Sequence, residues 1–410
     1  MNRCDTSPLL AYHEALEQLT SSVAAVGKVV DKPLLQVRGA VLAESIKSEI
    51  DVPGCAMSSM DGYAINTTDL AASGETSLPL SQRIAAGTAG ETLASGTAAR
   101  IFTGAPIPDG ADAVIMQEQV DADDHGIRFD SRPTKGNNIR PAGNDIQRGN
   151  IILHKGCRLR AQDIGLAASV GLQTLPVYEP VKVGMFFTGD ELVEPGQKLG
   201  AGKIYDSNRY TLHGLLESMD CEIVDLGLVG DTLAATREAM LRASSLADLV
   251  VTTGGVSVGE EDHVRIAIEQ LGELRLWRLA IKPGKPLAYG QINETAFIGL
   301  PGNPVSVFAT FCLFVCPVIQ IMQGRDWHQP IALAVSADFD WPKPDSRREF
   351  LRARLALDPS GQTVAQIYPN QDSGVLTSTV WADGFVEIGE NQTVQAGEPV
   401  NYLPFARFFS

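Results

Sequence analysis

Between residues 178 and 326, short apolar segments alternate with amphipathic segments of helical periodicity. Strands are predicted over 181–187, 221–229, 247–254, 287–290 and 295–300, and helices over 209–220, 233–244 and 260–271. This alternation predicts a doubly wound, mostly parallel α/β sheet with helices on both faces. Such sheets bind ligands outside the carboxyl ends of their strands, so functional residues are expected in the loops that follow the strands.

The flanking segments have a different composition. Helices are predicted over 11–23 and 41–50, and a strand followed by a helix over 151–171. From 51 to about 145, short β-prone runs alternate with Gly, Pro, Asp and Asn turns, which predicts a small β domain. After residue 325 the chain is again β-prone, which predicts a small barrel or sandwich.

Charge and cysteine content narrow the class of protein. With 33 Lys and Arg against 49 Asp and Glu, the formal net charge of this 410-residue chain is −16. Such a chain repels nucleic acid and anionic lipid, so neither is an expected partner. The six cysteines form no CxxC pair, which favours reduced thiols and a cytoplasmic location.

One segment, 305–322, is apolar enough to be considered for a membrane span. Pro317 interrupts it, and a strand and a glycine turn come directly before it. We therefore expect a helix buried in the α/β core, and no membrane partner.

The loop after the strand at 247–254 is rich in glycine and leads into a helix. Glycines at such a junction let backbone N–H groups close around an anion at the helix N-terminus. The loop contains neither a Walker A lysine nor the GxGxxG pattern, and the alternative is a turn that simply packs tightly. The residues expected to hold an anion are Gly254, Gly255, Ser257 and Gly259.

Asp262 lies beside this loop. A carboxylate there would repel a phosphate unless a cation lay between them, which predicts Mg²⁺. Asp190 and Glu191 follow the strand at 181–187 and offer a second carboxylate. We expect one of them to cap a helix and Glu191 to bind the metal.

Two further loops carry groups that suit anions. In IKPGKP, prolines brace Lys282 and Lys285, so these side chains lose less entropy when they hold a compact oxyanion; the alternative is a pair of solvated lysines. In FIGLPGNPVSV, Asn303 is expected to cap a helix, Pro304 to occupy its first turn and Ser306 to offer a hydroxyl.

Together the motifs of this chain resemble the molybdopterin molybdenumtransferase family, which also occurs as the C-terminal domain of gephyrin-like proteins. The motifs are SMDGYA, RIFTGAPIPDGADAVIMQE, GNNIRPAGNDI, TTGGVSVGEEDH, IKPGKP and GLPGNPVS. Several are long, and they occur in order along a resemblance that runs from about residue 8 to the C-terminus.

The resemblance implies an elongated subunit with four domains, and a homodimer. The domains are an N-terminal linker and dimerisation domain (1–50 and 146–177), an inserted β domain (51–145), a molybdopterin-binding α/β domain (178–326) and a C-terminal β-barrel domain (327–410). It also implies a cytoplasmic, Mg²⁺-dependent transferase that inserts molybdate into adenylylated molybdopterin and releases AMP. Other cofactor-biosynthesis proteins and apo-molybdoenzymes would be transient partners.

In the family, the inserted domain reaches the active site of the partner subunit, which implies a role for Asp61; the alternative is a plain turn residue. The implied catalytic residues are Asp61, Thr103, Asp145, Asp231 and Lys282. The substrate-binding residues are Gly254, Gly255, Ser257, Gly259, Lys285, Pro301, Gly302, Asn303, Pro304, Ser306, Arg347 and Ser373, and the metal ligands are Glu191 and Asp262. The neighbouring Arg348, Arg352 and Arg354 are expected to be solvated on an edge strand.

The chain departs from the family pattern at Ala56, Met57, Asn144, Phe187 and Asp372. The carboxylate of Asp372, next to Ser373, opposes oxyanion binding unless it points away. Two alternatives remain open: a non-catalytic molybdopterin-binding or scaffold homologue, and a tungstate-inserting enzyme, because tungstate and molybdate are tetrahedral dianions of nearly equal size.

Overall fold

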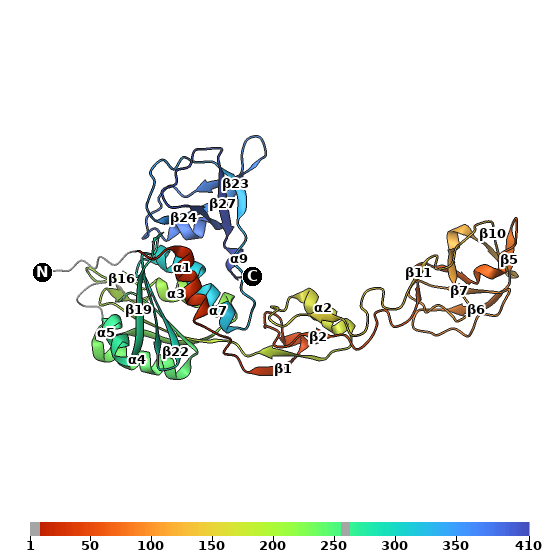
Figure 1. Ribbon diagram of the computed structural model, residues 1–410, viewed down its shortest axis with the longest axis horizontal. Coiled ribbons are helices and arrows are strands. Elements are labelled where there is room, and N and C mark those ends of the chain that lie inside the picture. Colours follow the sequence, from red (N-terminus) through yellow and green to blue (C-terminus); the bar gives the residue numbers. More distant parts are fainter. Residues whose placement is uncertain (1–8, 256–262, 410) are drawn as a thin grey trace.

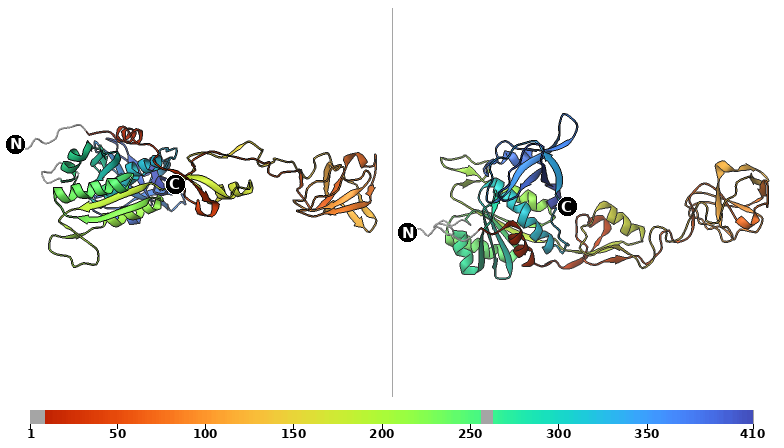
Figure 2. Two further views of the ribbon diagram at one scale, coloured as in Figure 1. Left: turned by 90° about the horizontal axis from the view of Figure 1, so that it is seen from below. Right: turned by 45° about the horizontal axis from the view of Figure 1, so that its top comes forward.

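The computed structural model describes residues 9–255 and 263–409. The molecule is elongated, with packed bodies arranged along its long axis (Figure 1). An α/β body and a C-terminal barrel are stacked at one end, a small linker body lies in the middle, and an inserted β body lies at the opposite end. Two further views show the same separation (Figure 2).

The α/β body contains a six-stranded sheet with the order β17-β14-β18-β22-β21-β19. Strands β14 (Lys182–Thr188), β17 (Glu222–Val229), β18 (Leu249–Thr253) and β22 (Thr295–Leu300) are parallel, whereas β21 (Pro286–Ile292) and β19 (Gly272–Arg278) run antiparallel. Helix α3 (Asn208–Ser218) packs on one face, and α4 (Leu233–Leu246) and α5 (His263–Leu271) on the other. The predicted mostly parallel sheet is confirmed; the charged edge strand β19 was not predicted.

The apolar segment forms a continuous helical rod in the core. It consists of α6 (Pro304–Thr310), a π-helical turn (Phe311–Val315) and α7 (Cys316–Met322). Pro317 lies in the first turn of α7, where the π turn accommodates its missing N–H. The rod is long and apolar enough to cross a membrane, yet 89% of an apolar 18-residue stretch of it is buried inside the protein. The predicted core helix is confirmed.

The linker body is built from two separated parts of the chain. Strand β1 (Val29–Pro33) pairs with β13 (Thr174–Tyr178), and β2 (Ile46–Lys47) with β12 (Ile151–Leu153), beside α2 (Ala161–Ser169). The helix predicted over 41–50 is wrong: this segment is extended, and its Val41 and Leu42 form bridges to Arg158 and Val177. Their burial in the linker core outweighs the local helical preference.

The N-terminal helix α1 (Tyr12–Ser21) packs on the α/β body. The inserted β body contains a four-stranded sheet of β6 (Leu80–Ile84), β7 (Ala98–Ile101), β4 (Gly62–Ile65) and β8 (Ala113–Met116). A second sheet joins β5 (Thr76–Leu78), β10 (Gly126–Phe129) and β9 (Asp121–Asp123), while β3 (Met57–Ser58) pairs with β11 (Ile139–Arg140).

The C-terminal body is a closed barrel. Its strands are β24 (Arg348–Leu357), β25 (Thr363–Ile367), β23 (Leu333–Ala337), β27 (Pro399–Pro404) and β26 (Gly384–Ile388), and β26 pairs back to β24. Short helices α8 (Thr377–Trp381) and α9 (Ala406–Phe409) flank it. The short strand β20 (Ile281–Lys282) of the α/β region pairs in parallel with β24. The predicted combination of an α/β domain with small β domains is confirmed.

Phe350 joins the barrel to the α/β body. Its ring is fully buried, and its centroid lies 5.3 Å from that of Tyr12 on α1 and 6.2 Å from that of Phe385 on β26. We expect Phe350→Ala to lower the free energy of unfolding by about 3–5 kcal/mol, because it leaves a cavity. Urea unfolding measures this. Leu357→Ala on the same strand, where Leu357 is 71% exposed, is the control and should change little. Equal effects would contradict the assigned role of Phe350.

Candidate functional site

An open cleft with a volume of about 630 Å³ lies between the α/β body and the barrel. The loops after β14, β20 and β22 form one wall, and residues of the barrel form the other. Its lining residues are Glu191, Ile204, Lys282, Pro283, Gly284, Lys285, Pro286, Pro301, Gly302, Asn303, Pro304, Ser306, Arg347, Gln371, Asp372 and Ser373. The cleft therefore gathers residues that the sequence analysis assigned to separate motifs.

Two of the predicted oxyanion-binding cations already face carboxylates. The Nζ of Lys282 lies 2.8 Å from Oε1 of Glu349 and 3.6 Å from Oδ2 of Asp345. The guanidinium of Arg347 donates two hydrogen bonds to Asp345, of 3.0 and 2.8 Å. These bonds from Arg347 hold the pKa of Asp345 well below its usual range. A dianion in the cleft must therefore share these cations with Asp345 and Glu349.

Lys285 is the more available cation of the IKPGKP loop. It is exposed, and no carboxylate in the described part of the chain forms an ion pair with it. The loop is held against α6 at Gly284, whose φ is +110°. A Cβ at Gly284 would lie 2.5 Å from Cγ2 of Thr310, so only glycine allows this close approach.

The start of α6 contacts the barrel. Asn303 does not cap the helix with its side chain, contrary to prediction; its Nδ2 instead donates to Oγ of Ser373 at 3.0 Å. The N–H of Val305 donates to the carbonyl of Ser373 at 3.1 Å. Pro304 occupies the first turn as predicted, and Ser306 is buried. The barrel loop thus takes the place of a cap.

Asp372 adds negative charge to this part of the cleft. Its carboxylate accepts the N–H of Gly374 at 2.8 Å in a tight turn, and its carbonyl accepts from Arg352. Arg352 is 1% exposed, and burial lowers its pKa to about 10. The prediction that Arg352 is solvated on an edge strand is therefore wrong, because β24 is paired on both sides. Arg348 pairs with Glu387 and Glu390, and Arg354 stacks on Trp381.

Glu191 lines the cleft, but no helix begins near it. The chain instead continues into β15 (Leu192–Val193), which pairs with β16 (Ile204–Tyr205), so the prediction that Asp190 or Glu191 caps a helix is wrong. In the described ranges, no group of three or more His, Cys, Asp or Glu side chains is arranged to hold a metal. Asp262, Ser257 and Gly259 lie outside the described residues, so the metal pair stays a prediction.

The glycine loop adjoins the loop of α6. Gly254 and Gly255 have φ values of +78° and +62°, and the N–H of Gly254 donates to the carbonyl of Leu300 at 3.0 Å. Asn208, at the start of α3, donates to the carbonyl of Gly302 at 2.8 Å. Sequence reasoning missed Asn208, as it missed Asp345 and Glu349.

The other predicted catalytic residues do not line this cleft. Asp61 and Thr103 lie in the inserted β body, at the far end of the molecule (Figure 1). There Oδ1 of Asp61 accepts hydrogen bonds from the N–H and hydroxyl of Thr103, both of 2.8 Å, and these bonds lower the pKa of Asp61. Asp145 is exposed where the chain returns to the linker body, and its N–H donates to Val52. Asp231 follows β17, one residue before the capping Thr232 of α4.

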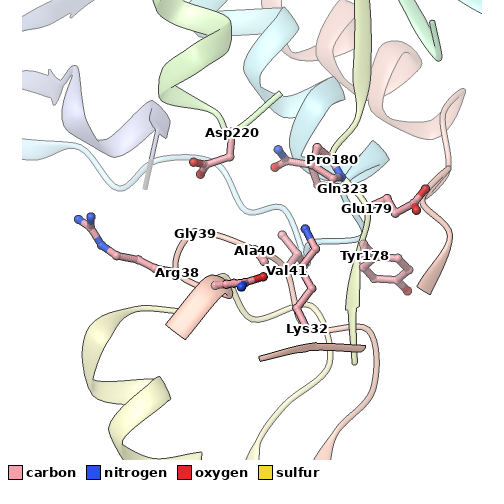
Figure 3. Close-up of a pocket in the computed structure, with 11 residues that line it drawn as sticks. Lys32, Arg38, Gly39, Ala40, Val41, Tyr178, Glu179, Pro180, Asp220 and Gln323 are labelled. Atoms are coloured by element: carbon pink, nitrogen blue, oxygen red, sulfur yellow. The ribbon is translucent and has the colours of Figure 1, made fainter. Parts of the chain in front are cut away.

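A second hollow lies between the linker and α/β bodies (Figure 3). Its volume is about 120 Å³, and its charges are mixed. Its lining includes Lys32, Arg38, Glu179 and Asp220, and Asp220 is already paired with Arg158. None of the predicted site residues lines it, so we regard it as a joint between bodies.

Comparison with known proteins gives matches along almost the whole chain. Three family models match: the MoeA N-terminal region (domain I and II) over residues 10–171, a probable molybdopterin binding domain over 184–321, and the MoeA C-terminal region (domain IV) over 334–405.

Similar proteins and structures carry matching names. A molybdopterin molybdenumtransferase of Haemophilus influenzae is 41% identical over 378 residues, covering 91% of this chain and 93% of that protein. One of Bacillus subtilis is 33% identical over 372 residues, covering 88% and 86%. The crystal structure of a molybdopterin biosynthesis MoeA protein from Pyrococcus horikoshii OT3 has a TM-score of 0.85 at 30% identity, covering 97% of this chain and 100% of that one.

Asp345→Asn tests the electrostatics of the cleft. Because the pKa of Asp345 is lowered in the folded state, its ion pairs stabilise the protein above the unfolded-state value of about 3.9 and lose this effect as the pH falls through the folded-state value. We expect the variant to be less stable than the wild type by about 1.5–3 kcal/mol at pH 7. Urea unfolding at pH 3 should give a smaller difference in the free energy of unfolding between the variant and the wild type. A difference independent of pH would contradict the role assigned to this carboxylate.

Proposed function

Because the chain belongs to the molybdopterin molybdenumtransferase family, we propose that its open cleft is where molybdate is inserted into adenylylated molybdopterin, with release of AMP and formation of molybdenum cofactor. The chain is a transferase of molybdenum cofactor biosynthesis. One observation carries the assignment of the site: predicted anion-binding residues from the α/β body and the barrel line a single cleft.

Different residues of the cleft suit different substrates. The loops that contain Gly254 and Gly302 adjoin each other at the ends of neighbouring parallel strands, where backbone N–H groups suit the phosphates of the pterin substrate. Lys282, Lys285 and Arg347 suit molybdate, since charged donors make the stronger hydrogen bonds to an oxyanion. Asp345 and Glu349 hold two of these cations in place before the oxyanion arrives.

Mg²⁺ is proposed to bind between Glu191 and Asp262. Glu191 faces the cleft with a carboxylate, the oxygen ligand that Mg²⁺ prefers. When bound, the ion would neutralise the phosphate oxygens as the adenylate bond is hydrolysed. Glu191 itself would position the metal beside the lysine loop.

We also propose a homodimer with composite sites. Asp61, Thr103 and Asp145 do not line the cleft of their own chain, and the inserted β body that carries Asp61 and Thr103 lies at the opposite end of the molecule (Figure 1). Two hydrogen bonds from Thr103 hold the Asp61 carboxylate in a defined position, where it could act on a cationic or metal centre of the partner. The inserted body of one subunit would bring these residues to the cleft of its partner, which Asp231 supplements from the end of β17.

The remaining proposals concern the surroundings of the reaction. The enzyme would work in the cytoplasm and meet other cofactor-biosynthesis proteins and apo-molybdoenzymes in transient contacts. A tungstate-inserting enzyme or a non-catalytic scaffold are the alternatives. A competition experiment between tungstate and molybdate would show which oxyanion the enzyme prefers. Absence of AMP release with either oxyanion would favour the scaffold.

The direct test is reconstitution with adenylylated molybdopterin, Mg²⁺ and molybdate. We expect AMP release and activation of an apo-molybdoenzyme by the wild-type protein. Lys285→Ala should weaken molybdate binding by about tenfold or more, because it removes one charged donor, and should leave the pterin substrate bound nearly as before. Lys198→Ala, which removes an exposed lysine that does not line the cleft, is the control.

Titrations of each variant with molybdate and with the pterin substrate decide the outcome. Equal losses for both ligands would show that Lys285 supports the pterin or the fold. Unchanged molybdate affinity would place the oxyanion elsewhere. Wild-type protein that releases no AMP would contradict the proposed reaction at this cleft.

A further inference from the structure

A four-layer stack of side chains lies at one rim of the inserted β body. Arg83 on β6, Arg100 on β7 and Tyr63 on β4 are direct neighbours across three strands. The Cζ of Arg100 lies 4.9 Å from the ring centroid of Tyr63 and 4.8 Å from that of Phe102. The Cζ of Arg83 lies 4.5 Å from the ring of Phe102. The contacts therefore run from Tyr63 through Arg100 and Phe102 to Arg83.

The inner layers of the stack are fixed in place. Arg100 donates to the carbonyl of Gly62 at 3.0 Å and to the side chain of Gln117, so its guanidinium is held at its edges as well as its faces. Phe102 is half-buried and contacts both guanidinium groups. Arg83 is exposed and ends the series, so its guanidinium is accessible to another planar group.

The charge of this stack is not neutralised within the body. All residues from 51 to 145 are described, and no carboxylate among the described residues forms an ion pair with Arg83 or Arg100. Asp61 attracts Arg100 at longer range without forming an ion pair with it, and its Oδ1 accepts both hydrogen bonds from Thr103. Two cations packed on one ring repel each other, and an anion close to them would offset this repulsion. The surplus of positive charge stands out in a chain of net charge −16.

The stack lies beside the predicted catalytic pair. Gly62 pairs with Ile101 in the antiparallel ladder of β4 and β7, so Asp61 just before Gly62 and Phe102 just after Ile101 are at the same end of these strands. A ligand bound at Asp61 and Thr103 would therefore lie near the strand end that carries Phe102.

We propose that the stack of Tyr63, Arg100, Phe102 and Arg83 binds the adenylate end of the substrate, with the purine ring on the outer face of Arg83 and its phosphate near the two guanidinium groups. This inference rests on the proposed function, because the composite site brings the inserted body to the partner's cleft. There the glycine loops suit the pterin phosphate, and the bond beside Asp61 joins that phosphate to adenylate. The planar purine continues the alternation of cation and ring, and the negative charge of the phosphate offsets that of the arginines.

Titration of the full-length protein with AMP tests the assignment. We expect Arg83→Gln and Phe102→Leu each to weaken AMP binding by about threefold to thirtyfold, the range for a lost cation–π contact. Both side chains are at least partly exposed, so the fold should persist. Arg128→Gln is the matched control: it removes an arginine of the same body that is paired with Asp123, and it should bind AMP as the wild type does. Molybdate affinity should be the same in all four proteins.

The outcomes separate this inference from the proposed function. Wild-type protein that binds no AMP, or variants that bind it as well as the wild type, would overturn the assignment even if molybdate insertion proceeds. Weaker binding of free molybdopterin, with AMP binding unchanged, would assign the stack to the pterin and contradict the proposal. Failure of the wild type to insert molybdate, with AMP binding weakened only in Arg83→Gln and Phe102→Leu, would refute the reaction and keep the nucleotide site.

Discussion

The short pairing between β20 and β24 determines how the cleft is built. Ile281 and Lys282 leave the α/β sheet and pair with Arg348 and Glu349 at the start of a barrel strand. This places Lys282 against the carboxylate of Glu349, while a single core beneath it buries Phe350 with residues of both bodies. The contact between Asn303 and Ser373 closes the other side. The two walls of the cleft are therefore fixed relative to each other by the pairing of β20 with β24, by the shared core around Phe350 and by the contact between Asn303 and Ser373.

The electrostatics of the cleft follow from this docking. Lys282 and Arg347 come from different bodies, yet both contact Asp345. Ion pairing holds these cations in defined positions in a chain whose net charge would otherwise disfavour anions. The inserted body has the opposite arrangement, in which Arg83 and Arg100 stack on Phe102 without a carboxylate partner among the described residues. The cations of the cleft are thus paired with carboxylates, whereas Arg83 and Arg100 of the inserted body are proposed to meet an anionic ligand.

Local patterns predicted the elements that depend on local sequence. The period of the apolar segments predicted the α/β sheet. The antiparallel pairing of β21 with β22 places Lys285, just before β21, near the end of β22 that leads to Ser306. Features set by tertiary contacts were missed. The segment 41–50 is extended because its Leu42 is buried in the linker core and its Ile46 packs against that core. Ser373 accepts the hydrogen bond of the Asn303 side chain, which was expected to cap α6. Asp345 and Glu349 gain their partners only when the barrel docks, so no spacing in the sequence indicated them.

The central claim is that a site is shared between the cleft of one subunit and the inserted body of another. It is tested most directly by mixing Asp61→Ala protein with Lys285→Ala protein under conditions that exchange subunits. Each heterodimer would carry one site with both defects and one with neither, so AMP release should recover toward about half of the wild-type rate per heterodimer when both single variants are inactive. Demonstrated exchange of subunits without any recovery of activity would contradict the shared site.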